Sequence, residues 1–225
     1  MKRTIVLLVV LSIAPIAFAA DSSPVNVVIT PRIALAIVSK DERKLDELDK
    51  AYLDAFTILR ADNACSRLYG GPGAIEALNE LMRVFRPAYL ERHIAVRMSG
   101  PTTLHENAVT GFSFRMFEKA EINKYGSFFR HNTPYGQRPP LVAEFQPNTR
   151  RARVAVLLHE LGHLVRGADK KWVLSDDGED LALSARNTKY VVDVCRKEIA
   201  AVTRMTATEQ LDEPLTTIAQ LATLP

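Results

Sequence analysis

Two histidines stand four residues apart, and a glutamate directly follows the first, in the run His159-Glu160-Leu161-Gly162-His163. Four residues make slightly more than one helical turn, so on a helix both imidazoles emerge on one face and can bind the same metal ion. Glu160 is offset from that face, which places its carboxylate too far from the ion to ligate it. It remains close enough to accept a proton from a water molecule that the ion activates.

The residues around this motif predict that it lies on a helix. Apolar side chains recur at spacings of three and four residues and give one buried face, formed by Val154, Leu157, Leu158, Leu161 and Val165. Gly162 costs about 1 kcal/mol of helix propensity relative to alanine, so we expect it to permit a close approach by another chain segment or a substrate. The alternative interpretation is a pair of partly buried histidines on an ordinary core helix.

The patterning of the rest of the chain predicts an α+β fold. Apolar residues at helical spacing indicate helices over Ser39 to Arg60, Ala74 to Val84 and Ser184 to Val202. Stretches rich in β-branched and aromatic residues predict short strands at His93 to Met98, Gly111 to Phe117 and Ser127 to Arg130. A polar loop, Gly167 to Leu181, follows the motif. We therefore expect a small mixed sheet packed on the motif helix, with helices on its flanks.

The first 20 residues have the pattern of a secretory signal. Lys2 and Arg3 precede an apolar run, Ile5 to Ile13, and small residues follow at Ala17 to Ala20. We expect the folded domain to cover residues 21–205 and a loosely attached tail to cover residues 206–225. No later apolar run approaches the roughly 20 residues that span a bilayer. The expected location is therefore secreted or periplasmic, with no membrane span after signal cleavage.

The chain has two cysteines, Cys65 and Cys195. An even pair in an exported chain favours a disulfide, and closing so long a loop contributes about 4 to 5 kcal/mol in the chain-entropy model. The alternative is two separate buried thiols. Zinc ligation by the cysteines is disfavoured, because the histidine pair indicates a site with an open position rather than a closed structural site.

The charge of the chain gives little support for nucleic-acid binding. The formal net charge is +3, and removal of Lys2 and Arg3 with the signal lowers it to +1. A basic patch at Arg150, Arg151 and Arg153 is interpreted as a set of solvated side chains at the start of a helix. We expect no nucleic-acid partner.

The HELGH motif and the predicted order of elements resemble those of the zincin metallopeptidases. The resemblance is strong over Arg153 to Val165, and a weaker similarity to exported bacterial proteins with HELGH extends through Asp177 and Asn187 to Cys195. It implies a zincin-like fold and one zinc ion. In zincins an edge strand above the motif helix binds the substrate backbone, and here Tyr125 to Phe129 is the candidate. The alternative is a plain sheet segment whose phenylalanines fill the core.

Three residues are candidates to complete a ligand set with His159 and His163. Asp177, in an acidic loop fourteen residues after His163, resembles the third ligand of the aspzincins without their Gly-Thr-x-Asp context. Asp169 stands where metzincins place their third ligand, but the expected glycine is displaced by one residue. Glu198, on the downstream helix, would make a gluzincin-like site. Asp177 ranks first, Asp169 second and Glu198 third. The alternative for the acidic loop is a solvated turn or a surface calcium site.

These features predict an exported zinc-dependent metallopeptidase that acts on a peptide or protein substrate. Zinc lowers the pKa of water toward about 7, and Glu160 accepts the proton as general base and delivers it to the leaving amine. Tyr190, His131 and Tyr135 are candidates to stabilise the oxyanion. The second functional class is a secreted zinc-binding envelope or interaction protein with little or no hydrolysis. Substrate specificity and oligomeric state stay open.

Overall fold

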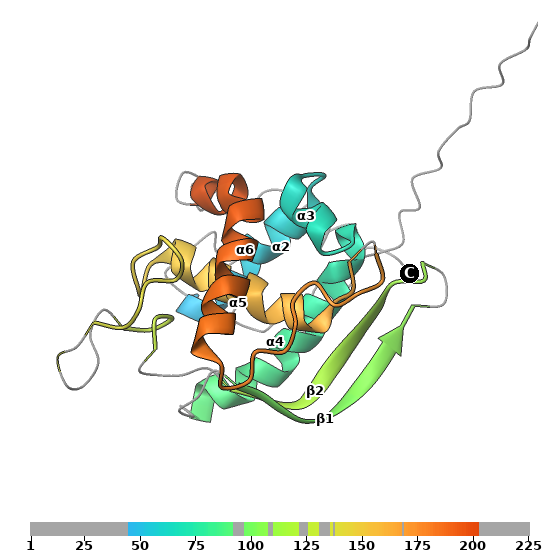
Figure 1. The fold of residues 1–225 in the computed structure, drawn as a ribbon, viewed down its shortest axis with the longest axis horizontal. Helices are drawn as coiled ribbons and strands as arrows, with labels where there is room; N and C mark the ends of the chain where they lie inside the picture. Colours follow the sequence, from blue (N-terminus) through green and yellow to red (C-terminus); the bar gives the residue numbers. More distant parts are fainter. Residues whose placement is uncertain are drawn as a thin grey trace, which may run out of the picture.

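Helix α5 (Arg150–Leu164), which carries the motif, lies near the centre of the computed structural model (Figure 1). The structure describes residues 45–91, 97–107, 110–121, 126–130, 136, 138–167 and 169–202. In chain order the other elements are α2 (Glu47–Arg60), α3 (Ala64–Leu68), η2 (Gly71–Gly73), α4 (Ala74–Glu91), β1 (Arg97–Glu106), β2 (Ser113–Glu121) and α6 (Leu181–Ala201). The predicted signal, residues 1–20, and the predicted tail, residues 206–225, lie outside the described residues.

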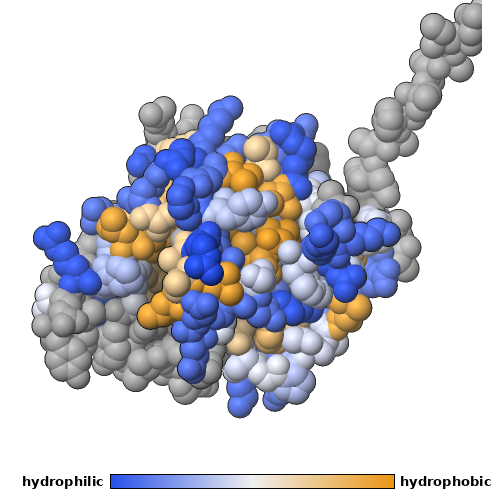
Figure 2. Space-filling view, in the orientation of Figure 1, coloured by the Kyte–Doolittle hydropathy of each residue, from blue (hydrophilic) through white to orange (hydrophobic). Residues whose placement is uncertain are grey.

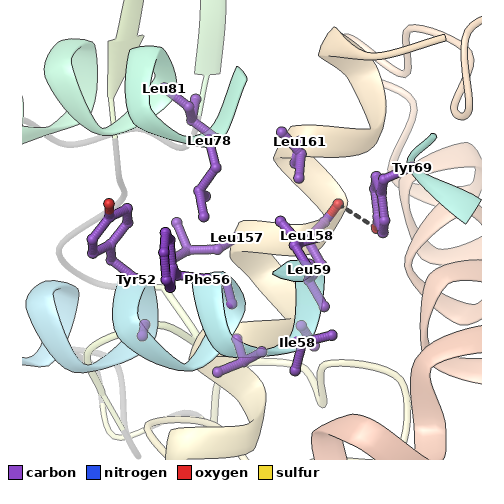
Figure 3. Close-up of a cluster of buried hydrophobic side chains, with 14 of the residues drawn as sticks. Tyr52, Phe56, Ile58, Leu59, Tyr69, Leu78, Leu81, Leu157, Leu158 and Leu161 are labelled. Atoms are coloured by element: carbon purple, nitrogen blue, oxygen red, sulfur yellow. Dashed lines mark hydrogen bonds between the residues drawn. The ribbon is translucent and has the colours of Figure 1, made fainter. Parts of the chain in front are cut away.

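The core of the protein is built around α5. Helices α2, α4 and α6 all contact it, and Leu157, Leu158 and Leu161 are fully buried. Figure 3 shows these leucines among labelled side chains of α2 and α4, which are Tyr52, Phe56, Ile58, Leu59, Leu78 and Leu81. Full burial of a leucine contributes about 1.5 to 3 kcal/mol relative to exposure. Packing therefore holds α5 in place despite the poor helix propensity of Gly162.

Capping side chains determine where the main helices begin. The Thr149 hydroxyl accepts a hydrogen bond from the backbone N–H three residues later (3.2 Å), so α5 begins at Arg150, four residues before Val154. Asp46 caps α2 and Asp180 caps α6 in the same way. The predicted helices on the flanks are thus confirmed, except that the first begins at Glu47 and does not include Leu45 and Asp46. Residues 39–44 lie outside the described part of the chain.

Strands β1 and β2 form an antiparallel sheet, and no third strand joins it within the described residues. Among the described residues the sheet is antiparallel rather than mixed as predicted, because the short connection between these strands permits only antiparallel pairing. Strand β2 covers most of the predicted strand Gly111–Phe117, whereas most of His93–Met98 lies outside the described residues. Phe114 of β2 pairs through its backbone with Val165, directly after α5, so the sheet is tied to the motif helix.

The segment predicted as the strand Ser127–Arg130, and as the substrate-binding strand Tyr125–Phe129, forms a turn where it is described. Its backbone groups bond to a loop and a helix. The Ser127 carbonyl accepts from the Asn148 backbone N–H (2.6 Å), and the Phe128 carbonyl accepts from Arg153 Nε (3.0 Å). The Phe128 side chain is buried in the core. Burial explains the aromatic pattern, and both strand predictions are wrong.

The predicted disulfide is confirmed. Cys65 of α3 and Cys195 of α6 are bonded, with 4.6 Å between their Cα atoms, and both side chains are fully buried. The outer face of α6 exposes charged side chains together with Leu181 and Tyr190, and Figure 2 shows hydrophilic and hydrophobic surface side by side on this face of the molecule. Across the described residues, no helix is both long enough and apolar enough to cross a membrane.

The basic patch at the start of α5 is not the set of solvated side chains that its sequence suggested. Arg150 forms a two-pronged contact with the fully buried carboxylate of Asp54 on α2, at 2.6 and 2.8 Å. Arg151 donates to the Ala200 carbonyl at the end of α6 (3.1 Å). Their partners lie about 50 to 100 residues away in the sequence, so local patterning could not reveal them. These arginines join α5 to its neighbours.

Candidate metal centre

The last two turns of α5 place His159 and His163 on one buried face. Their Nε2 atoms lie 3.1 Å apart, and their rings meet edge to face. The loop between α5 and α6 brings a carboxylate to the same point: Asp177 Oδ2 lies 3.2 Å from His159 Nε2 and 3.5 Å from His163 Nε2. The structure therefore brings together the two motif histidines and the aspartate that ranked first as third ligand.

The separations between these donor atoms match the size of a zinc ion. Tetrahedral zinc has bonds of about 2.0 to 2.1 Å to imidazole nitrogen and carboxylate oxygen, which places neighbouring ligand atoms about 3.3 to 3.4 Å apart. The three distances here, 3.1, 3.2 and 3.5 Å, lie on both sides of that value. Two imidazoles and one carboxylate leave a fourth position open, as catalytic zinc sites require. The residues fit the ion.

Gly162 explains how the loop reaches the histidines. Leu174 folds back over α5, where its backbone N–H donates to the Gly162 carbonyl (2.9 Å). A Cβ atom on Gly162 would lie 2.7 Å from two side-chain carbons of Leu174, which is closer than real contacts allow. The close approach expected at this glycine is therefore confirmed, and the approaching group is a chain segment. Three residues later this segment supplies Asp177.

Helix α6 contacts His159 through the ring nitrogen that faces away from the other donor atoms. The Thr188 hydroxyl lies 3.0 Å from His159 Nδ1 and donates its own proton to the Ser184 carbonyl (2.9 Å). Its lone pairs can then accept the proton of Nδ1, which in the neutral imidazole leaves Nε2 unprotonated and directed at the other donors. Outer partners of this kind orient the ligands of metal sites.

Asn187, the neighbour of Thr188, contacts the loop that carries the aspartate. Its amide donates to the Ser175 carbonyl (3.0 Å) and lies 3.5 Å from Asp177 Oδ2. No role was predicted for Asn187 or for Thr188 from the sequence. The available signal was a row of polar side chains on one face of α6, Ser184, Asn187 and Thr188, at helical spacing. In contrast to His159, His163 has a buried Nδ1 with no hydrogen-bond partner among the described residues.

The acidic and basic groups of the cluster perturb one another. Burial by itself raises the pKa of Asp177, but the hydrogen bonds with His159 and His163 outweigh it and hold that pKa well below its usual value. Burial lowers the pKa of His159, but the hydrogen bond with Asp177 and the charge of Glu160 raise it above its usual value. The metal-free cluster thus favours a protonated imidazole next to an ionised carboxylate, and a cation that binds there replaces the proton.

Glu160 lies beside the two histidines without joining their group of donor atoms. It is buried, it is not one of the three residues whose donor atoms converge, and it lines the same cleft of about 340 Å³. Burial raises the pKa of Glu160, and the two histidines partly offset this rise by favouring the charged form. The cleft is otherwise lined by Met98, Phe117, Asp176, Gly178, Leu181 and Ser184.

The other candidates lie away from this cluster. Asp169 is exposed and accepts a hydrogen bond from the Lys171 backbone N–H (3.0 Å). Glu198 is ten residues after Thr188 on α6, a distance of about 15 Å along a helix, so it cannot reach His159. Tyr190 is half exposed and does not line the described cleft. His131 and Tyr135, the other oxyanion candidates, lie outside the described residues.

Comparison with known proteins does not assign a family. The chain matches no protein-family model, no curated protein and no solved structure. The described residues define an α+β protein in which His159, His163 and Asp177 form a group that could hold a metal ion. The zincin resemblance of the motif remains a prediction from the sequence.

Proposed function

We propose that this protein is an exported zinc-dependent metallopeptidase that hydrolyses peptide bonds in peptides or proteins. One observation carries the proposal: three donor atoms converge at separations suited to zinc, and a buried glutamate outside the ligand group lines the same cleft. A site that only stored metal would not need Glu160. The disulfide and the predicted signal support an oxidising compartment outside the cytoplasm.

The proposed roles follow from the positions of the side chains. His159, His163 and Asp177 hold the ion, which when bound supplies Lewis acidity that activates water and polarises a carbonyl. Glu160 accepts a proton from the attacking water as the water oxygen bonds to the carbonyl carbon. The same carboxylic acid then gives this proton to the nitrogen as the C–N bond breaks. Burial raises the pKa of Glu160, which makes its carboxylate a stronger base for the first of these transfers.

The substitution Glu160→Gln separates metal binding from hydrolysis. The amide has nearly the same volume and does not contact the ion, so we expect about one zinc per chain in both parent and variant. Cleavage of an unfolded protein should fall by about 100-fold or more, because general-base assistance contributes 10²- to 10⁴-fold. Zinc content is measured by elemental analysis and cleavage by release of labelled peptides.

The matched control is Glu144→Gln, at a surface residue that pairs with Arg196 away from the cleft. This variant should keep both zinc and activity. Loss of zinc from Glu160→Gln would show that Glu160 is a ligand. A parent that binds zinc but cleaves nothing would instead identify a zinc-binding envelope or interaction protein.

A further inference from the structure

Arg115 of β2 connects the two parts of the chain that carry the proposed ligands. Its Nε donates to the carbonyl of His163 at the end of α5 (2.8 Å). Its two terminal nitrogens bind the carboxylate of Asp176, one of them at 3.2 Å. Asp176 immediately precedes Asp177 in the sequence. One guanidinium group thus links His163, in the last turn of α5, to the residue that precedes Asp177.

The surroundings of Arg115 hold its side chain in one orientation. The guanidinium carbon lies 4.3 Å from the centre of the Trp172 ring, and Arg166 contacts the same ring at 4.7 Å. The Arg115 side chain is only 13% exposed, whereas that of Asp176 is 60% exposed. The strand that carries Arg115 is itself tied to the end of α5 through the Phe114–Val165 backbone pair. Arg115 is therefore the fixed partner, and Asp176 is the group that it holds.

We infer that Arg115 is a positioning residue that keeps Asp177 within reach of His159 and His163. The inference rests on the metal centre proposed above. An exposed ion pair by itself contributes little to stability. Here the pair fixes the segment between Leu174, which is bonded to α5, and Asp180, which begins α6. Only a planar, forked donor can bind a carboxylate at two points, reach a carbonyl and stack on an indole together.

Electrostatics and positioning make opposite predictions for Arg115→Met. Removal of the guanidinium takes away a positive charge near the site and leaves Asp176 unpaired beside Asp177. If only charge mattered, this change would strengthen the binding of a divalent cation. A positioning role predicts weaker binding, because Asp177 no longer stays close to the histidines. Arg115→Lys sharpens the contrast, since it retains the charge but loses the two-point contact and the stacking.

The test measures the zinc dissociation constant of the full folded chain by competition with a chelating dye. We expect Arg115→Met to raise this constant by about 10- to 100-fold, which is typical for loss of an outer partner at a metal site, and Arg115→Lys to raise it in the same direction. Cobalt(II) bound in place of zinc should show a changed visible absorption spectrum in both variants, because coordination geometry changes. A purely structural role would not change that spectrum.

Arg196→Met is the matched control, since Arg196 also pairs with two carboxylates, those of Glu144 and Asp193, but on the exposed side of α6. It should bind zinc as the parent does. Unchanged or tighter binding in Arg115→Met, with the parent binding zinc normally, overturns the inference about Arg115 alone. A parent that binds no zinc overturns the metal centre and this inference together. If Arg115→Met does not fold, Arg115→Lys decides in the same way.

Discussion

Charged groups are buried at both ends of α5, but the groups that lie beside them differ. At the N-terminal end, Arg150 and Asp54 form a two-pronged ion pair in which each charge faces its opposite. At the C-terminal end, the buried carboxylate of Glu160 and the partly buried carboxylate of Asp177 lie with two imidazoles. Arg151 and Arg153 of α5 bind backbone carbonyls elsewhere. The first end is balanced by a permanently charged arginine, whereas the second depends on the protonation of its own side chains.

This difference separates a structural use of buried charge from a functional one. A buried ion pair with complete hydrogen bonding joins two helices and needs nothing more. For the group with two carboxylates, converging donor atoms and an imidazole nitrogen without a described partner, we propose that a bound cation supplies the balance. We therefore expect substitutions at the N-terminal end to change stability, and substitutions at the C-terminal end to change metal binding.

The largest effect is expected for His163→Ala. Removal of one of three proposed ligands should abolish stoichiometric zinc binding, measured by elemental analysis after gel filtration, because the remaining two donors do not complete a site. The metal-free variant should unfold at nearly the same denaturant concentration as the metal-free parent. His105→Ala, at a β1 histidine stacked on Phe114, is the control and should retain zinc. Normal zinc content in His163→Ala would refute the ligand assignment.

Asp54→Ala should have the opposite profile. It removes the carboxylate that binds the Arg150 guanidinium at a position only 22% exposed, so the free energy of unfolding should fall by about 3 kcal/mol, the lower end of the range for breaking a buried pair. The zinc dissociation constant of the folded protein should not change. Asp62→Ala, which breaks an exposed pair with Arg67, should change stability by less than about 0.5 kcal/mol. Equal effects in the two denaturant titrations would contradict the comparison.

Thr188→Val should have the smallest of the three effects and sharpens the comparison most. Valine has the shape of threonine but cannot accept the proton of His159 Nδ1, so zinc affinity should fall by about 10- to 100-fold. Thr57→Val is a close control, because Thr57 also donates to a carbonyl four residues back (2.8 Å) but contacts no proposed ligand. Chelator competition measures both variants. The role of Thr188 fails if the two substitutions change affinity equally.

Local patterns predicted the parts of this protein that depend on neighbours in the sequence. The apolar spacing around His159 and His163 identified α5, and helical spacing identified α6. The pairing of Cys65 with Cys195 followed from the number of cysteines and the predicted secretory signal. Asp177 could only be ranked ahead of its rivals, because the path of the loop depends on the contact between Leu174 and Gly162.

The predictions that were wrong or missing depend on partners far away in the sequence. The turn around Phe128 looked like a strand because its aromatic residues fill the core, while its backbone bonds to Arg153. The arginines at the start of α5 looked solvated because Asp54 precedes Arg150 by 96 residues. Thr188 had no visible role because its function depends on which ring nitrogen of His159 faces α6.

The disulfide has a consequence for the order of events during maturation. Cys195 lies two helical turns after Thr188, a distance of about 10 Å, so the bond to α3 anchors the helix that orients His159 from outside. In a reducing compartment this anchor is absent, and the newly made chain is expected to compete poorly for zinc. For the exported zinc peptidase proposed above, oxidation would come first and metal acquisition second, which would delay hydrolysis until the chain has left the cytoplasm.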